Sequence, residues 1–153
     1  MRFDDVLGTV RTIDLTAPAA VAAAWRQIVD LVGRRRAPAD EWAMTTLARI
    51  RDRVPEATRA ASARALFGAH PPAALVTLLS TDTIAVAAPV LRSARLPDDE
   101  WAALLARLTP TARAVLRHRR DLSPAVVRAL DDFGTVDFVL GDRSEAPAEI
   151  APS

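Results

Sequence analysis

The side chains that could carry out chemistry are few, and the sequence does not group them. The chain has two histidines, no cysteine and five glycines. His70 lies in a proline-flanked turn and His118 in a run of arginines, and neither has a second ligand at metal-binding spacing on a shared helix face. No serine stands in a nucleophile elbow, and no glycine-rich loop could cradle a phosphate. We therefore expect no catalytic residue, no metal ion and no cofactor.

The acidic run Asp98-Asp99-Glu100 could hold a hard cation, because such ions prefer carboxylate oxygens. The run also follows Pro97 at a predicted helix start, where the helix dipole favours acidic side chains. The dipole is the simpler explanation. The sequence therefore predicts a helix N-terminus here and no metal site.

Two arginine clusters are the main candidates for an interaction surface. They comprise Arg34, Arg35 and Arg36 in the first and Arg117, Arg119 and Arg120 in the second. Both fall at predicted helix C-termini, where a cation opposes the helix dipole and stabilises by about 0.3–1 kcal/mol. In this structural interpretation Asp40 and Glu41, in the next first turn, lie beside the first cluster. In the functional interpretation the clusters share one edge of the helices and form a basic strip for an acidic partner or a phosphate backbone.

The three tryptophans are Trp25, Trp42 and Trp101. Each lies early in a predicted helix or on its inward stripe, so core packing is the default expectation. Trp42 stands beside the stripe of its helix and not within it. We therefore expect Trp42 to be a partly exposed contact residue.

Composition favours a helical domain without special chemistry. Of 153 residues, 50% are hydrophobic and 25% charged, a globular balance in which alanine and leucine favour helix. The formal charge of +1 argues against a general electrostatic grip on nucleic acid. No apolar run reaches the roughly 18 residues that cross a bilayer, so we expect no membrane insertion. The N-terminus lacks a secretory pattern, which predicts a cytoplasmic protein.

Proline and glycine divide the chain into short helices. The first predicted helix begins at Pro18 and ends at Gly33, in the position favoured for a left-handed cap. The segment of residues 83–94 is apolar nearly all round, so we expect its helix to be buried. Pro89 either kinks this helix or lies in its first turn, if the helix starts late enough. We favour the kink.

The predicted fold is all-α, with about eight short antiparallel helices in an irregular stack (an α-solenoid) or a compact bundle. Residues 1–15 are predicted to form an extended N-terminal arm. Residues 16–140 are predicted to form one helical domain, and residues 141–153 a flexible linker or tail.

The run LLSTDTIAVAAPVLRSARLPDDEWAALL, continued by TARAVLRHRRDLSPAVVRAL, resembles an uncharacterised family of HEAT-like helical-repeat domains from alphaproteobacteria. Members of this family share a series of motifs in this order: leucines, then an Asp, then Val-Ala-x-Pro-Val-Leu, then Leu-x-[Asp/Glu]. A later motif is Arg-x-x-Leu-Ser. These correspond here to Leu78–Leu91, Leu96–Asp99 and Arg120–Ser123, the last with slightly different spacing. The resemblance covers about residues 70–133. It implies a HEAT-like stack at the N-terminus of sensor histidine kinases from sphingomonad-type bacteria, and it carries over no catalytic or ligand residue.

The sequence thus predicts a non-catalytic regulatory or protein-interaction module, the N-terminal input region of a bacterial signalling protein. Its partners would be proteins or adjacent signalling domains, and kinase activity would reside beyond residue 153. The alternative is a nucleic-acid-binding helical repeat that uses the arginine edge. A third hypothesis is a small-molecule sensor with a pocket near Pro89.

Overall fold

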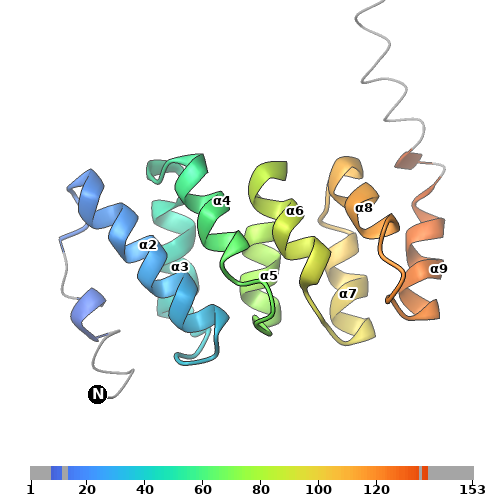
Figure 1. The fold of residues 1–153 in the computed structure, drawn as a ribbon, viewed down its shortest axis with the longest axis horizontal. Helices are drawn as coiled ribbons and strands as arrows, with labels where there is room; N and C mark the ends of the chain where they lie inside the picture. The colour runs from blue at the N-terminus through green and yellow to red at the C-terminus, as the bar shows by residue number, and fades with distance from the viewer. Residues whose placement is uncertain (1–7, 12–13, 135, 138–153) are drawn as a thin grey trace, which may run out of the picture. The chain divides into compact units, whose positions relative to one another are not determined.

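The computed structural model describes residues 8–11, 14–134 and 136–137, and this part of the chain is helical with no strand (Figure 1). The predicted all-α class is confirmed. The elements are α2 (Pro18–Gly33), α3 (Glu41–Ile50), the 3-10 turn η1 (Arg51–Arg53), α4 (Glu56–Arg64), α5 (Ala73–Ser80), α6 (Ile84–Ser93), α7 (Asp98–Leu105), α8 (Pro110–Arg117) and α9 (Pro124–Asp132). Residues 8–11 are also helical, where an extended arm was predicted. The predicted tail of residues 141–153 lies outside the described residues.

Local capping explains where several helices begin. The side chains of Asp40, Thr109 and Ser123 each accept a hydrogen bond from the backbone N–H three residues later. A proline at the first position of α8 and of α9 adds the fixed φ that a helix start needs. These starts were readable from the sequence because each signal is contained within four residues.

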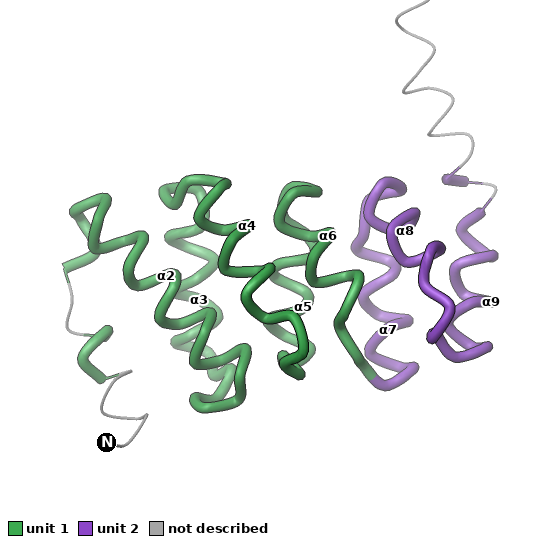
Figure 2. The backbone as a smooth tube through the Cα atoms, in the orientation of Figure 1, with its two compact units in different colours: residues 1–96 green, residues 97–153 purple. Residues whose placement is uncertain are grey.

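The chain folds into two compact units, residues 1–96 and 97–153 (Figure 2). The sequence predicted one domain over residues 16–140. The boundary falls where α6 ends: Ala94 has an extended backbone, with φ −61° and ψ 144°, and Pro97 then precedes α7.

Unit 1 has two layers of helices. In Figure 1, α2, α4 and α6 lie side by side in the front layer, and α3 and α5 lie behind them. Large apolar side chains fill the space between the layers and are shielded from solvent. They include Trp25, Ile28, Leu47, Ile50, Leu75, Leu79 and Leu91.

Helix α6 runs through Pro89 without interruption. It begins at Ile84, so Pro89 lies inside the helix and the alternative of a late helix start is wrong. Val86, Val90 and other residues of its inner face are buried. Ile84 is 43% exposed, so the expectation that the segment is buried all round holds only for the inner face.

The end of α2 differs from the predicted left-handed glycine cap. Gly33 is the last helical residue, and its φ is not positive. A Cβ atom added to Gly33 would lie 2.5 Å from Leu66 Cδ2, so a larger residue here would require the Leu66 side chain to shift. The left-handed conformation falls instead on Arg35, with φ 59°. A non-glycine residue in this region costs of order 1 kcal/mol, which the surrounding contacts must offset.

Unit 2 consists of α7, α8 and α9. Helices α7 and α9 pack against each other, and α8 contacts α9. The buried apolar side chains of the unit come from all three helices. Among the described residues they are Trp101, Leu104, Leu105, Ala112, Leu116, Val126 and Leu130, together with Leu108 between α7 and α8.

Candidate functional site

The first arginine cluster braces the loop that joins α4 to α5. Arg34 Nε donates to Asp30 Oδ1 at 2.7 Å, and Arg34 Nη2 donates to the carbonyl oxygen of Ala65 at 2.8 Å. Arg35 Nε donates to the carbonyl oxygen of His70 at 2.7 Å. These bonds fasten both ends of the loop to the end of α2. Arg34 and Arg35 therefore hold this loop in place.

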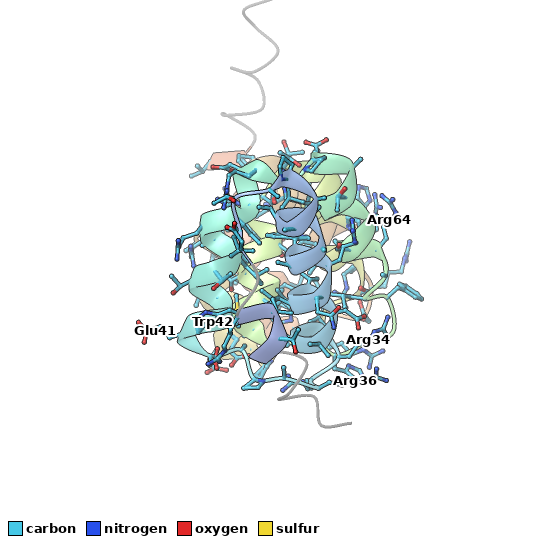
Figure 3. All side chains as sticks on the ribbon, turned by 90° about the vertical axis from the view of Figure 1, so that its left-hand side faces the viewer. Arg34, Arg36, Glu41, Trp42 and Arg64 are labelled. Carbon is cyan, nitrogen blue, oxygen red and sulfur yellow. The ribbon has the colours of Figure 1, made fainter. Side chains whose placement is uncertain are left out.

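The acidic partners of Arg34 are not those that the sequence suggested. Arg34 pairs with Asp30 one turn earlier in α2, whereas Asp40 pairs with Arg11 at 3.2 Å. Figure 3 shows Arg34 on the opposite side of unit 1 from Glu41. The predicted pairing of Arg34 with Asp40 and Glu41 was wrong, because Asp40 turns to cap its own helix and accepts from the Ala43 N–H at 2.8 Å.

The loop braced by Arg34 and Arg35 displays Phe67. This side chain is 80% exposed, the largest exposed fraction among the large hydrophobic residues described. Its neighbour Gly68 has φ +83°, a conformation that glycine adopts without steric cost, and the turn is closed by the Ala69 N–H, which donates to the Leu66 carbonyl at 2.9 Å. Leu66 is buried and anchors the turn from below. The aromatic ring is thus held outward on a well-supported turn.

Two exposed arginines belong to the segments that form or brace this loop. Arg64 ends α4, three residues before Phe67, and Arg36 follows the braces Arg34 and Arg35. Figure 3 shows Arg34, Arg36 and Arg64 on one side of unit 1, facing away from Trp42. We call Phe67, Arg64 and Arg36 the Phe67 surface. The sequence pointed to Arg36 but not to Phe67, whose only signal was an aromatic residue directly before a glycine and outside any apolar stripe.

Trp42 is half-buried, in accord with the expected partial exposure. The guanidinium carbon of Arg11 lies 4.5 Å from the centre of its ring, a cation–π contact. Arg11 also pairs with Asp40, so it is held in place. Arg11, near the N-terminus, therefore already covers one face of the Trp42 ring. Less of the ring is left for a partner to contact.

Arg117, in the second cluster, is occupied within unit 2. Its Nη2 donates to Asp137 Oδ2 at 2.6 Å and to the Leu130 carbonyl at 3.0 Å. These contacts join the end of α8 to α9 and to the residues after it. Arg117 is thus part of the internal structure of the unit.

Arg119 and Arg120 differ from each other. Arg119 pairs with Asp121 through two hydrogen bonds of 2.9 and 2.7 Å, and its guanidinium carbon lies 5.8 Å from the ring centre of Trp101. Arg120 is exposed. The two clusters belong to different units, so the idea of one shared basic edge stays a prediction.

A buried arginine joins three segments of unit 1. Arg59, on α4, donates through Nε and Nη2 to both oxygens of Asp82 at 2.9 and 3.0 Å. Its Nη1 donates to the carbonyls of Arg51 and Val54 at 3.2 and 2.5 Å. Only 10% of the Arg59 side chain and 4% of the Asp82 side chain are exposed. A planar guanidinium suits this site because it can satisfy a carboxylate and two carbonyls at once.

Unit 2 repeats this arrangement around Arg113 on α8. Its Nε and Nη2 donate to Asp137 at 2.6–3.0 Å, and its Nη1 donates to the carbonyls of Leu105 and Leu108 at 2.9 and 2.6 Å. The hydrogen bonds from Arg113 hold the pKa of the Asp137 carboxyl below its usual value, against the opposing effect of burial, and Arg117 adds to the lowering. The fold thus stabilises the ionised carboxylate form of Asp137.

The repetition extends to the sequence, where it is easily missed. The carbonyls that accept from Arg59 and from Arg113 lie eight and five residues before each arginine, and the paired acids lie 23 and 24 residues after. The segments EWAMTTLAR (41–49) and EWAALLAR (100–107) share their first three and last three residues. The Glu-Trp-Ala starts lie 59 residues apart but the two buried arginines lie 54 residues apart, which hides the similarity from a search at a fixed period. The two units thus share the same arrangement of a buried arginine, two carbonyls and a carboxylate.

The described residues present no site for a metal ion, since no three His, Asp or Glu side chains among them come together. Nor does any helix within the described ranges have the length and apolar character needed to cross a membrane. Comparison of the chain with protein-family models, with curated proteins and with solved structures gave no match.

Proposed function

We propose that this chain is a non-catalytic protein-interaction module and that the Phe67 surface of unit 1 contacts the partner. The observation that carries the proposal is Phe67, which is 80% exposed on a loop fastened by Arg34 and Arg35. Burying a phenylalanine side chain is worth about 1.5–3 kcal/mol, a gain that this fold leaves unused.

The support of the loop favours binding. A loop that is already ordered loses little conformational entropy when a partner binds, so more of the contact energy appears as affinity. Aromatic and arginine side chains are enriched at the centres of protein interfaces. The Phe67 surface offers both, so its natural partner would present an apolar pocket with an acidic rim.

A regulatory role in bacterial signalling is the second part of the proposal. It rests on the resemblance of residues 70–133 to the N-terminal regions of sensor histidine kinases. A module without catalytic residues would there recognise a partner or an adjacent domain and change the activity of the kinase. A histidine-kinase core encoded in frame after Ser153 would support this role.

The interaction can be tested with a photo-crosslinking residue at position 67. We expect p-benzoylphenylalanine at position 67 to crosslink one protein in extracts of the source organism. The same residue at position 84, where Ile84 is also exposed, serves as the matched control and should not capture that protein. Once the protein is purified, Phe67→Ala should weaken its binding at least about tenfold while the helical circular dichroism is unchanged. Equal binding by the wild type and Phe67→Ala would contradict the proposal.

Nucleic-acid binding remains the alternative, because Arg36, Arg64 and Arg120 are exposed cations. Phosphate contacts make affinity fall steeply as salt rises. Titration of duplex DNA at low and high salt separates the two functions. We expect no salt-sensitive binding, and a steep salt dependence that Arg64→Glu abolishes would favour the nucleic-acid hypothesis instead.

A further inference from the structure

A hollow of about 460 Å³ lies on unit 1 between α2 and α4, the two neighbouring helices of the front layer. Its lining is mainly apolar and small on the α4 side and partly charged on the α2 side. The residues that matter here are Arg26, Val29, Asp30, Ala57, Ala61 and Ala65. We call this hollow the α2–α4 groove. It does not include Pro89, beside which the sequence suggested a pocket.

The walls of the groove differ in what they offer a ligand. Ala57, Ala61 and Ala65 are exposed and succeed one another by a helical turn along α4, so a bound chain can approach its backbone closely. Val29 is buried and provides an apolar floor. A segment with small or medium apolar side chains would fit this wall and floor.

The charges around the groove select the sign of the ligand. The acidic residue in the lining, Asp30, is already paired with Arg34, whose Nε lies 2.7 Å from Asp30 Oδ1. Arg26 lines the groove, and Arg64 stands beside its α4 wall. Within the part of the chain that the structure describes, neither Arg26 nor Arg64 has an acidic partner. The groove therefore has an excess of positive charge that an acidic ligand would complement.

We infer that the α2–α4 groove binds an acidic segment of a protein partner, with apolar side chains against the alanine wall and a carboxylate on Arg26. This inference rests on the proposed interaction function and identifies the chemistry of the partner. The groove reaches the start of the loop that carries Phe67: Ala65 lines the groove two residues before Phe67, and Arg34 bonds to both Asp30 and Ala65. One partner segment can thus cover both.

The test uses the full chain and a random-peptide library displayed on phage. Peptides that bind the immobilised protein are synthesised with a fluorescent label, and their dissociation constants are measured by anisotropy. Ala61→Gln adds bulk to the exposed alanine wall without charge, and Arg26→Glu reverses the charge of the groove. Arg49→Glu is the matched control, because Arg49 is an exposed arginine of the same unit on α3, in the other layer. Circular dichroism confirms that each variant is folded.

We expect the selected peptides to carry Asp or Glu beside apolar residues. Their dissociation constants should rise about tenfold or more in Ala61→Gln and Arg26→Glu and stay nearly constant in Arg49→Glu. Equal weakening by Arg49→Glu would show general charge attraction and overturn the inference, as would binding that is insensitive to Ala61→Gln or needs no acidic residue.

The Phe67→Ala variant separates this inference from the proposed function. Peptides weakened by Phe67→Ala but unaffected by Ala61→Gln would support the interaction function and overturn the groove as the binding site. A library that yields no binding peptide would overturn the inference, while leaving the crosslinking experiment at position 67 to decide the proposed function.

Discussion

At the scale of single residues, the two buried arginines are the most consequential side chains of the fold. Arg59 and Arg113 each tie a carboxylate from a later segment to the carbonyls that end the preceding helix. The Arg51 and Leu105 carbonyls also accept from the backbone N–H groups of Val54 and Leu108, so each arginine adds a side-chain bond at the point where a helical segment ends. One guanidinium therefore closes a helix end and joins three segments.

Removal of Asp82 tests this role. Asp82→Ala leaves the Arg59 guanidinium buried without its carboxylate, so we expect the free energy of unfolding to fall by about 3–5 kcal/mol. Urea denaturation followed by circular dichroism measures the change. Asp52→Ala is the control: the Asp52 side chain is 93% exposed, and its loss should change stability by less than about 0.5 kcal/mol. Similar effects of the two substitutions would rule out a special role for the buried pair.

The lowered pKa of Asp137 predicts how the stability of unit 2 depends on pH. Hydrogen bonds from Arg113 lower the pKa of Asp137 in the folded state, so the folded state binds this proton more weakly than the unfolded state. Its contribution to stability is therefore fully present above the unfolded pKa of about 3.9 and is lost as the pH falls through the lower folded value. The stability difference between wild type and Asp137→Asn should be largest near neutral pH and shrink below about pH 4. A difference that stays constant down to acid unfolding would contradict this.

At the scale of elements, the helices were predictable because their signals are local. Proline starts, capping side chains and apolar stripes each occupy a few adjacent residues, and they identify the helices from α2 to α9. The helix of residues 8–11 has no such signal and was missed. Contacts between elements were not predictable in this way. The sequence placed Asp40 beside Arg34, although Arg34 pairs with Asp30 one turn earlier in its own helix. It also placed Gly33 in a left-handed cap, whereas the packing of Leu66 against Gly33 depends on contacts between segments distant in the sequence.

The candidate site shows the same limit. The first arginine cluster was identified from its charge, but its role as a brace depends on carbonyls more than thirty residues away. Phe67 was not identified, because exposure is a property of the folded surface. A single aromatic residue near a helix end gives no periodic pattern from which its exposure could be inferred.

The loop between α4 and α5 offers a prediction at this scale. Arg34→Ala removes the hydrogen bonds to Asp30 and to the Ala65 carbonyl, which should loosen the turn that carries Phe67 at a cost of about 1 kcal/mol in global stability. We expect faster amide hydrogen exchange at Ala69, whose N–H closes the turn, with little change in α5. Arg64→Ala is the control, since Arg64 makes no side-chain bond to the loop among the interactions described. Unchanged exchange at Ala69 would mean that other contacts hold the turn.

At the scale of the whole molecule, the chain consists of two compact units that contain the same arginine device. Each unit also carries a Glu-Trp-Ala helix start whose tryptophan lies under an arginine: Arg11 over Trp42 and Arg119 over Trp101. Each unit thus has its own buried arginine pair and its own arginine–tryptophan contact.

The tryptophans allow this organisation to be tested without altering the core. Trp25 and Trp42 belong to unit 1 and Trp101 to unit 2, so 5-fluorotryptophan labelling gives fluorine NMR signals from both units in one sample. In urea, Asp137→Asn should lower the midpoint reported by Trp101 by about 1 M and leave those of Trp25 and Trp42 nearly unchanged, because the lost pair stabilises unit 2 alone. Asp82→Asn should produce the reverse pattern. If all three signals move together in both variants, the units unfold as one cooperative domain, as the sequence first suggested, and a partner bound at the Phe67 surface would then stabilise the whole chain by mass action.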